Sequence, residues 1–356
     1  MYHLQLLLTF LLLYSNQDDA IYFQSDKLKG IEWQQNTSLN FIIDDKGEQI
    51  EILGKKDEEG HLYWHRRLKT PVCLVGECLL IEIGIYWDLT GDFFGLEVYE
   101  EALTKTDHSE FTAEDYKRLI EILENDWSPL REYDLADLVE QPYSESPEVD
   151  GTSGATKKEI AEEAVADAVY TTHTIWHLSH VGEKEQLIDL AVRELNKDKD
   201  LFSLLMQKDQ SSDYISFFLD LFSQNKLEHV EHLNSLVIRS MGFKNKPKIR
   251  DKAIRTLSYC NFSDDYFLNK IIDIYHKLPV KEKLQSLNEF KKIKFFPEPL
   301  YQAIVNNIEN QQEWFIIKVF QVMANRDQFK DKLISLASNL SHIDNPQLQN
   351  VLEEYQ

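Results

Sequence analysis

Apolar and polar positions change their spacing about halfway along this chain. In the N-terminal part, short runs alternate apolar with polar residues, which is the period of strands with one exposed side. Residues 39–43 and 49–53 flank a polar turn and predict a hairpin. Residues 72–88 predict a stronger strand, followed by a turn and a returning strand at 93–99. We therefore expect an antiparallel sheet in this part of the chain.

Helical spacing dominates from residue 183 onward. Segments with apolar residues at i, i+3, i+4 and i+7 are expected at 184–195, 212–222, 229–241, 249–259, 266–278, 299–307, 314–323 and 329–340. Paired helices without a fixed repeat length predict an irregular α-solenoid resembling HEAT repeats, and 249–257 is the best single match. A compact helical bundle is the alternative. Because no catalytic constellation occurs here, we expect this region to bind a partner.

Two helices are also expected before residue 183. One runs to about residue 124 and begins with a capping box formed by Thr112 and Asp115. The other covers 157–180, where small residues on one side suit packing against a sheet. Between them, the acidic, Pro-containing segment 127–148 shows no period and is expected to be mostly irregular.

The stretch Asp150-Gly-Thr-Ser-Gly-Ala-Thr156 carries the clearest candidate chemistry. Gly151 and Gly154 allow left-handed backbone and the close approach of a ligand. Successive accessible N–H groups in such a turn form an anion-binding nest, and the N-terminus of a following helix adds positive potential. The pattern therefore favours phosphate binding. A polar loop that leads into the capping box Thr156–Glu159 is the purely structural alternative.

This stretch resembles the flavinylation motif of FMN-binding domains, which occur in extracytoplasmic subunits of Rnf-type and sodium-translocating NADH:quinone oxidoreductase complexes. In that family the last Thr carries FMN through a phosphoester bond made by a flavin transferase. The resemblance implies that Thr156 is the acceptor and that the remaining recognised residues are Asp150, Gly151, Ser153, Gly154 and Ala155.

The strand, turn and strand across 79–98 also resemble the sheet of these FMN-binding domains. In the family, the segment after the second strand helps to cover the flavin. The resemblance therefore implies that Thr106 and His108 contact the cofactor, whereas helix capping and loop structure are their alternative roles. No resemblance to the family extends beyond residue 182. The implied fold class is an α+β FMN-binding-like domain followed by an all-α irregular solenoid or helical bundle.

His173, His177 and His180 follow at i, i+4 and i+7 and are expected to share one helical face. Such spacing could hold zinc, haem or another transition metal. No carboxylate or cysteine at ligand spacing completes the shell, so packing or a flavin-lining surface is the favoured interpretation. We do not assign a metal site from the sequence.

The charge distribution and the N-terminal residues bear on the partners and the location of the protein. Of the 356 residues, 1–200 hold 42 Asp and Glu against 18 Lys and Arg, a net −24, whereas 201–356 hold 19 against 20, a net +1. Such an acidic chain disfavours nucleic acid as a partner. The apolar run 4–14 is too short to span a bilayer and fits the core of a secretory signal, with an apolar strand or helix as the alternative.

We expect three parts from these patterns: a signal peptide at 1–20, an FMN-binding-like domain at 21–182 and a helical domain at 183–356. Export to the periplasm or the exterior would allow a small disulfide between Cys73 and Cys78, although a metal or redox pair is also open. Cys260 lies in an apolar helical pattern and is expected to be an inert thiol.

Two functions remain open from the sequence. The first is an extracytoplasmic electron-transfer flavoprotein with FMN on Thr156, matured by a flavin transferase, with redox partners and peripheral association with a membrane complex. The second is a non-catalytic interaction scaffold whose FMN-domain-like module has lost flavin. The electron donor and acceptor cannot be assigned from the residues.

Overall fold

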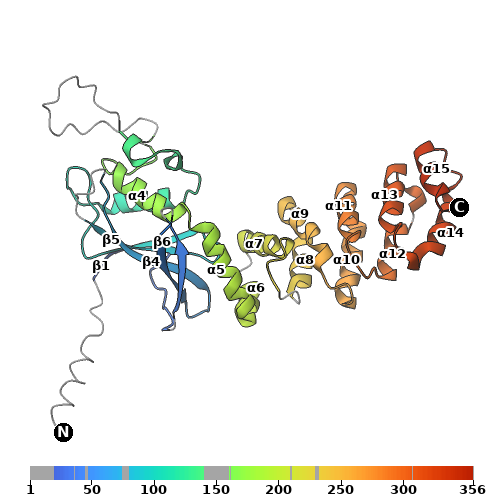
Figure 1. Cartoon of the computed structure of the whole chain (residues 1–356), viewed down its shortest axis with the longest axis horizontal. Helices are drawn as coiled ribbons and strands as arrows, with labels where there is room; N and C mark the ends of the chain where they lie inside the picture. The colour runs from blue at the N-terminus through green and yellow to red at the C-terminus, as the bar shows by residue number, and fades with distance from the viewer. Residues whose placement is uncertain are drawn as a thin grey trace, which may run out of the picture. The chain divides into compact units, whose positions relative to one another are not determined.

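The chain divides into two compact units, Met1–Ala191 and Val192–Gln356. The computed structural model in Figure 1 describes residues 20–35, 37–44, 47–73, 80–139, 160, 162–208, 211–228, 232–306 and 308–355. The first unit is α+β and the second is all-α, as the sequence predicted. The sequence placed the division at residue 183, and the structure places it inside helix α5 (Lys184–Lys197).

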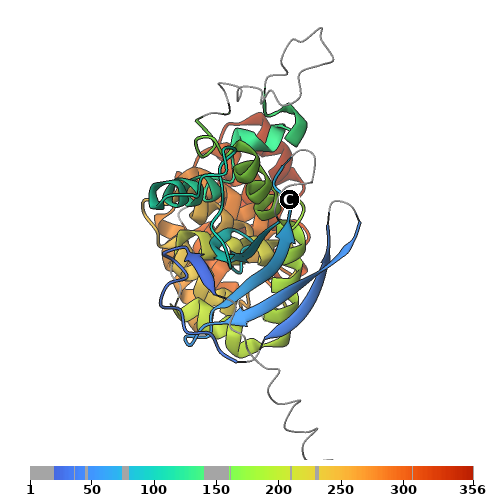
Figure 2. The ribbon, with the colours of Figure 1, turned by 90° about the vertical axis from the view of Figure 1, so that its left-hand side faces the viewer.

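A six-stranded antiparallel sheet forms the centre of the first unit, in the order β1-β6-β5-β4-β3-β2. Its strands are β1 (Ile21–Gln24), β2 (Ser38–Ile43), β3 (Gln49–Lys56), β4 (Leu62–Thr70), β5 (Ile81–Trp87) and β6 (Phe93–Tyr99). The predicted hairpin of β2 and β3 is confirmed, with Leu39 opposite Leu53, and it lies at the outer edge of the sheet (Figure 2). The predicted turn from β5 into β6 is also confirmed.

The two faces of this sheet differ in chemistry because side chains alternate along each strand. Ile83, Ile85 and Trp87 of β5 are fully buried on one face. The indole Nε1 of Trp87 donates a hydrogen bond to Ser179 O of α4 (Val169–His180) at 2.8 Å, so this face packs against that helix. The opposite face carries polar side chains, among them Tyr86.

Helix α2 (Ala113–Leu123) has the predicted capping box, since the Thr112 side chain accepts from Asp115 N and the Asp115 side chain accepts from Thr112 N. It buries Tyr116 and Leu119 among other apolar residues. The described part of the segment predicted to be irregular contains two short 3-10 helices, η1 (Pro129–Glu132) and η2 (Leu135–Asp137).

The single helix expected over 157–180 is wrong in its middle part. Residues 162–168 form turns, and α4 begins only at Val169. Asp167 has a left-handed φ of 59°, which interrupts a helix, and its carbonyl accepts hydrogen bonds from Thr106 N and Oγ1. The apolar spacing was helical, but these tertiary hydrogen bonds favour a turn.

The second unit is built of helices from α6 to α15, with short 3-10 segments between some of them. They are α6 (Lys199–Lys208), α7 (Ser212–Ser223), α8 (Leu233–Met241), α9 (Pro247–Arg255), α10 (Asp265–Lys277), α11 (Val280–Phe290), α12 (Glu298–Val305), α13 (Glu313–Met323), α14 (Lys330–Leu340) and α15 (Pro346–Glu353). The sequence missed α6, α11 and α15. In α11 and α15 the fully buried apolar residues number only two each, so the stripe is short.

These helices lie in two layers. Helices α8, α10 and α12 contact one another in succession, as do α7, α9, α11, α13 and α15, and α8 packs on α9 across the layers. Figure 1 shows the helices following one another along this unit. Side-chain amides fix the connecting loops. Asn196 bonds Lys226 O and Glu228 N, and Asn234 bonds both the N–H and the carbonyl of Asn261.

No helix within the described ranges is long and apolar enough to cross a membrane. Cys73 is disulfide-bonded, and Cys78 lies outside the described residues. Cys260 is a free cysteine that follows a 3-10 helix, Leu257–Tyr259, rather than lying inside a helix. Desolvation by the surrounding protein raises the pKa of the Cys260 thiol, and the thiol is therefore a poor nucleophile.

Candidate functional site

The motif residues Asp150, Gly151, Ser153, Gly154, Ala155 and Thr156 lie outside the described residues. The chain that follows them is anchored in the first unit. Ile160 is fully buried, the Arg118 guanidinium of α2 donates to Glu162 O, and Ser128 Oγ lies 3.5 Å from Glu163 Oε2. The downstream flank of the motif is therefore attached to α2 and to the segment that follows α2.

The two predicted contact residues occupy the loop between β6 and α2, and both are exposed. Thr106 donates from its amide and its hydroxyl to Asp167 O, each at 2.7 Å. His108 has a left-handed φ of 65°, and its amide donates to Lys105 O at 3.0 Å. Thr106 therefore ties this loop to the chain downstream of the motif, while the His108 side chain stays open to solvent.

A groove of about 680 Å³ lies beside this loop, between β1 and α2. Its floor is aromatic: Phe23 and Tyr116 stack with ring centroids 4.1 Å apart, and Phe94 and Phe111 also line it. Burial raises the pKa of Tyr116 to about 12, so this ring stays neutral. Because these two rings stack on each other, a planar ligand would lie against the aromatic floor rather than between the two rings.

Charged side chains border the groove. Lys27 pairs with Glu124 at 2.8 Å, and Lys29 pairs with Asp26 at 2.7 Å. Lys117 of α2 adds an exposed ammonium group. The groove is therefore amphipathic, with an apolar floor and a border of mixed charge that also contains Asp26, Glu121 and Glu124.

The groove lies next to two segments of interest: the loop with the predicted contact residues Thr106 and His108, and the chain that follows the motif. Phe111 follows the loop that contains Thr106 and His108, and Lys117 precedes the Arg118 that holds Glu162. The sequence did not identify the groove. Its two sides come from β1 and α2, and in the sequence all of β2 to β6 lie between these two elements. Its only sequence signal was the group of aromatic residues at 22–23 and 111–116.

The three histidines share α4 but do not converge on one point. The His173 and His177 rings stack with centroids 3.9 Å apart, and His173 Nε2 donates to Tyr133 O at 2.7 Å. Burial lowers the pKa of His173 to about 4, although the Tyr133 carbonyl opposes this shift. Across the part of the chain that is described, no group of three or more His, Cys, Asp or Glu side chains could hold a metal ion.

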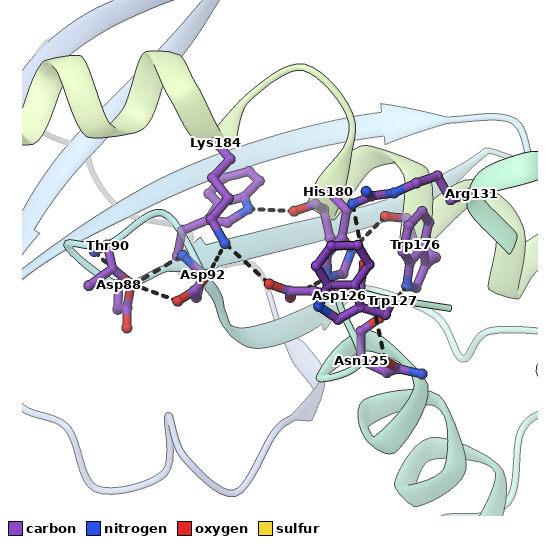
Figure 3. A network of polar contacts seen from close by, with 12 residues as sticks. Asp88, Thr90, Asp92, Asn125, Asp126, Trp127, Arg131, Trp176, His180 and Lys184 are labelled. Carbon is purple, nitrogen blue, oxygen red and sulfur yellow. Dashed lines mark hydrogen bonds and ion pairs between the residues drawn. The ribbon is translucent and has the colours of Figure 1, made fainter. Parts of the chain in front are cut away.

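His180 instead belongs to a network of acidic and basic groups, shown in Figure 3. Its Nε2 lies 3.4 Å from Asp126 Oδ1, within ion-pair distance, without the geometry of a hydrogen bond. Lys184 Nζ contacts Asp126 Oδ2 at 3.1 Å and also bonds Asp92. Interaction with His180 and attraction by Lys184 outweigh partial burial and hold the pKa of Asp126 well below its usual range.

The turn between β5 and β6 supplies the acidic side of this network. Asp88 Oδ1 accepts from Thr90 N at 2.8 Å and from Thr90 Oγ1 at 2.6 Å. Burial, aided by the charge of Asp92, raises the pKa of Asp88 to about 6 despite these hydrogen bonds. Gly91 has a φ of 79°, and a side chain there would press on Lys184. The turn is therefore shaped to receive the lysine.

Aromatic side chains form the other side of the network. Trp176 stacks on His180 with centroids 4.4 Å apart, and the Arg131 guanidinium lies 5.6 Å from the Trp127 ring. Trp127 is 84% exposed. The cavity beside these groups measures about 110 Å³, which is too small for a cofactor such as FMN. We interpret the network as structural: its contacts hold α4, the start of α5 and the β5–β6 turn together.

A second polar network lies on the opposite face of the sheet. Glu97 is 4% exposed and accepts hydrogen bonds from Tyr86 at 2.9 Å, Tyr99 at 2.5 Å and Gln24 at 2.9 Å. The His65 ring lies tilted against Tyr86 with centroids 4.4 Å apart, and neither of its ring nitrogens has a hydrogen-bond partner. Burial and the nearby Lys55 and Arg67 charges lower the pKa of His65 to about 3. The sequence missed this network, although Glu97 inside an apolar strand was a visible signal.

No protein-family model matches this chain, and neither the curated proteins nor the solved structures contain a match to it.

Proposed function

We propose that this protein is an extracytoplasmic flavoprotein that carries FMN covalently on Thr156 and transfers electrons. The motif from Asp150 to Thr156 carries the proposal, since it contains every position of the flavinylation motif it resembles. The groove between β1 and α2 supports it, because its aromatic floor suits a flavin ring and Lys117 offers an ammonium group to the phosphate side chain, although carboxylates also border the groove.

The chain's own residues would bind and orient the cofactor. Phe23, Phe94, Phe111 and Tyr116 would contact the ring system, and Lys117 would face its anionic substituent. FMN supplies one- and two-electron transfer when bound. The excess of carboxylates in the first unit would disfavour an anionic reduced ring and so lower its reduction potential.

Location and assembly belong to the same proposal. Residues 1–20 would direct export, a flavin transferase would attach FMN, and the protein would associate peripherally with a membrane complex through redox partners. The second unit would be a HEAT-like solenoid rather than a bundle, because its helices pair and then stack in two successive layers.

Co-expression of the exported protein with a flavin transferase tests the cofactor. A denatured gel band that fluoresces is the expected result. Thr156→Val should remove the fluorescence because no hydroxyl remains, whereas Thr156→Ser should retain part of it. Thr152→Ala and Ser153→Ala are the matched controls and should stay labelled. A folded, co-expressed protein without flavin would contradict the proposal, and flavin lost on denaturation would remove only the covalent bond.

The groove is tested separately on labelled protein. Phe94→Leu should change the flavin absorption spectrum and expose the flavin to solvent quenchers. Lys117→Glu should also change the spectrum, and it should lower the reduction potential of the flavin. Trp127→Leu is the control, since this exposed ring lines the small cavity at α4 rather than the groove. Equal spectra for all three variants would place the flavin elsewhere while leaving its attachment intact.

A non-catalytic interaction scaffold is the second candidate function, and one observation in the second unit favours it. The loop 291–297 presents Phe295 at 88% exposure beside Lys294, while Phe296 is buried. Arg326 donates to Phe290 O at 2.9 Å and to Ile293 O at 3.0 Å, so the loop is held in place. An exposed aromatic ring on a loop that is held in place is a residue that a protein partner could bury.

A further inference from the structure

A strongly basic segment lies in the second unit. Residues 239–255 contain seven Lys or Arg residues and one Asp, a net charge of +6, although the whole chain carries −23. Within α9, Lys248, Lys252 and Arg255 follow at i, i+4 and i+7 and share one side of the helix. The buried residues of α9 lie on its other sides. Lys248 and Arg255 are exposed and Lys252 is half-buried, so this side faces solvent.

A recess of about 220 Å³ opens on this side of α9, toward α7. Its lining residues are Asp220 and Ser223 of α7 and Lys248, Asp251, Lys252 and Arg255 of α9. Lys252 pairs with Asp220, and Arg255 pairs with Asp251 at 2.5 Å. Lys248 has no carboxylate partner in the part of the chain that the structure describes. Three cations thus line the recess with two carboxylates, which leaves an excess of one positive charge.

Helix α11 continues the basic surface beyond the recess. α9 and α11 pack on each other, and Figure 1 shows both along the same side of the second unit. Gln285 Nε2 of α11 donates to Asp251 Oδ1 at 2.7 Å, so this side of α11 adjoins the recess. Lys281 lies one turn before Gln285 and is exposed, as is Lys244 just before α9. Within the described ranges, neither lysine has a carboxylate partner.

We propose that this surface binds an acidic segment of a partner protein and that one Asp or Glu side chain of the partner enters the recess. That carboxylate would meet Lys248 and balance the excess positive charge, while neighbouring acidic residues would meet Lys244 and Lys281. Charges more than about 8 Å away are largely screened at physiological ionic strength, so the net charge of the whole chain does not cancel this local attraction. Such binding requires no flavin in the first unit.

Two features favour a protein over a nucleic acid or an anionic lipid surface. Nucleic acids and anionic lipids present many phosphates side by side, and Asp220 and Asp251 would repel such an array. A protein segment can instead place one carboxylate in the recess and uncharged residues on either side. Tyr259 is also 39% exposed, and its hydroxyl donates to Ser223 O at 3.1 Å, so an aromatic ring borders the recess. Tyr and Arg side chains such as these are enriched in protein interfaces.

Fluorescence anisotropy of a labelled decapeptide of alternating Glu and Ala, titrated with the full-length protein, tests this surface. We expect binding that weakens as salt is added, and no binding of the matching Gln and Ala peptide. Lys248→Glu should weaken the affinity about tenfold or more, because it reverses the charge of the unpaired cation. Lys270→Glu is the matched control: this exposed lysine lies on α10, in the other layer of helices, and its variant should bind like the wild type.

Asp251→Asn should act in the opposite direction. It removes a carboxylate from the recess and keeps an oxygen for Gln285, so the acidic peptide should bind about threefold more tightly. Misfolding cannot produce this gain. Absence of peptide binding, an unchanged affinity of Lys248→Glu, an equal loss for Lys270→Glu, or weaker binding by Asp251→Asn would overturn the proposal. Single-stranded DNA or phosphatidylglycerol vesicles that bind through Lys248 when the acidic peptide does not would overturn it as well.

Discussion

The two units of this protein are stabilised in different ways. In the first, strands far apart in sequence pair into a sheet, and ionisable groups such as Glu97 and His65 are buried within it. In the second, neighbouring helices pack in sequence order, and hydrogen bonds from side chains such as Asn234 and Arg326 fix the loops. The first unit therefore combines long-range contacts with buried ionisable groups, whereas the second depends on local packing and loop hydrogen bonds.

This difference assigns separate roles to the units. A site that changes the ionisation of its groups needs burial and charged neighbours, and the first unit provides both. A stack of helices offers an extended surface, which suits partner binding. The first unit should consequently respond to pH more strongly than the second. Tryptophan fluorescence can report this response, because five of the six tryptophans precede residue 192.

The largest expected effect is loss of stability of the first unit in acid. The folded-state pKa of His65 is about 3, below its ordinary 6.5, so its contribution is present above pH 6.5 and is lost as pH falls toward 3. The shift corresponds to about 5 kcal/mol as an upper bound. Urea unfolding followed by tryptophan fluorescence at pH 7 and pH 4 should show the loss.

His65→Leu should flatten that pH dependence, because leucine cannot be protonated and the ring nitrogens it replaces have no partners. Its stability at pH 7 should change little. An unchanged acid response in the variant would show that other groups cause the loss. His173, whose pKa is about 4, would then be the next group to replace.

A smaller effect is expected from Arg326→Ala in the second unit. The guanidinium donates to the carbonyls of Phe290, Lys291 and Ile293 and lies 4.3 Å from the Phe296 ring. Removing these contacts should cost about 3 kcal/mol, since hydrogen bonds from charged groups contribute about 1.5–3 kcal/mol each and water replaces part of them.

Far-UV circular dichroism during urea unfolding measures the effect of Arg326→Ala. Lys332→Ala is the control, because it removes a half-exposed ion pair with Glu298 that should contribute less than about 1 kcal/mol. Equal losses of stability in the two variants would show that the loop hydrogen bonds of Arg326 contribute no more than a half-exposed ion pair.

Asp88→Asn should act in the opposite direction to the histidine. The folded-state pKa of Asp88 is about 6, above its ordinary 3.8, so its favourable contribution is present below pH 3.8 and is lost as pH rises through 6. Asparagine keeps an oxygen for Thr90 N without the buried charge. The variant should gain about 1–2 kcal/mol at pH 8 and almost nothing at pH 4, measured by urea unfolding. A gain at both pH values would exclude the charge as the cause.

The smallest change should follow from removing the first unit. A fragment of residues 183–356 keeps the whole of α5 and every helix contact of the second unit. We expect cooperative, strongly helical unfolding with a midpoint close to that of the second unit in the full chain. Calorimetry and circular dichroism measure both. A molten or insoluble fragment would show that the two units stabilise each other.

The sequence by itself determined features that depend on local periodicity. The β2–β3 hairpin, the capping box of α2 and most helices of the second unit follow from apolar spacing and short-range hydrogen bonds, which neighbouring residues encode. The motif ending at Thr156 and its implied cofactor are also readings of the sequence alone, and they stay predictions. The structure describes residues on either side of that motif.

Tertiary structure decided what depends on distant segments. The break before α4 required Thr106 to bond Asp167, and the groove required β1 to reach α2 across β6. The histidines of α4 share a face by spacing, but stacking, burial and Asp126 give each a different environment. The recess of the second unit requires α7 to lie beside α9 and Lys252 to pair with Asp220. Periodicity specifies which face of an element is apolar, but only the packed chain specifies what that face meets.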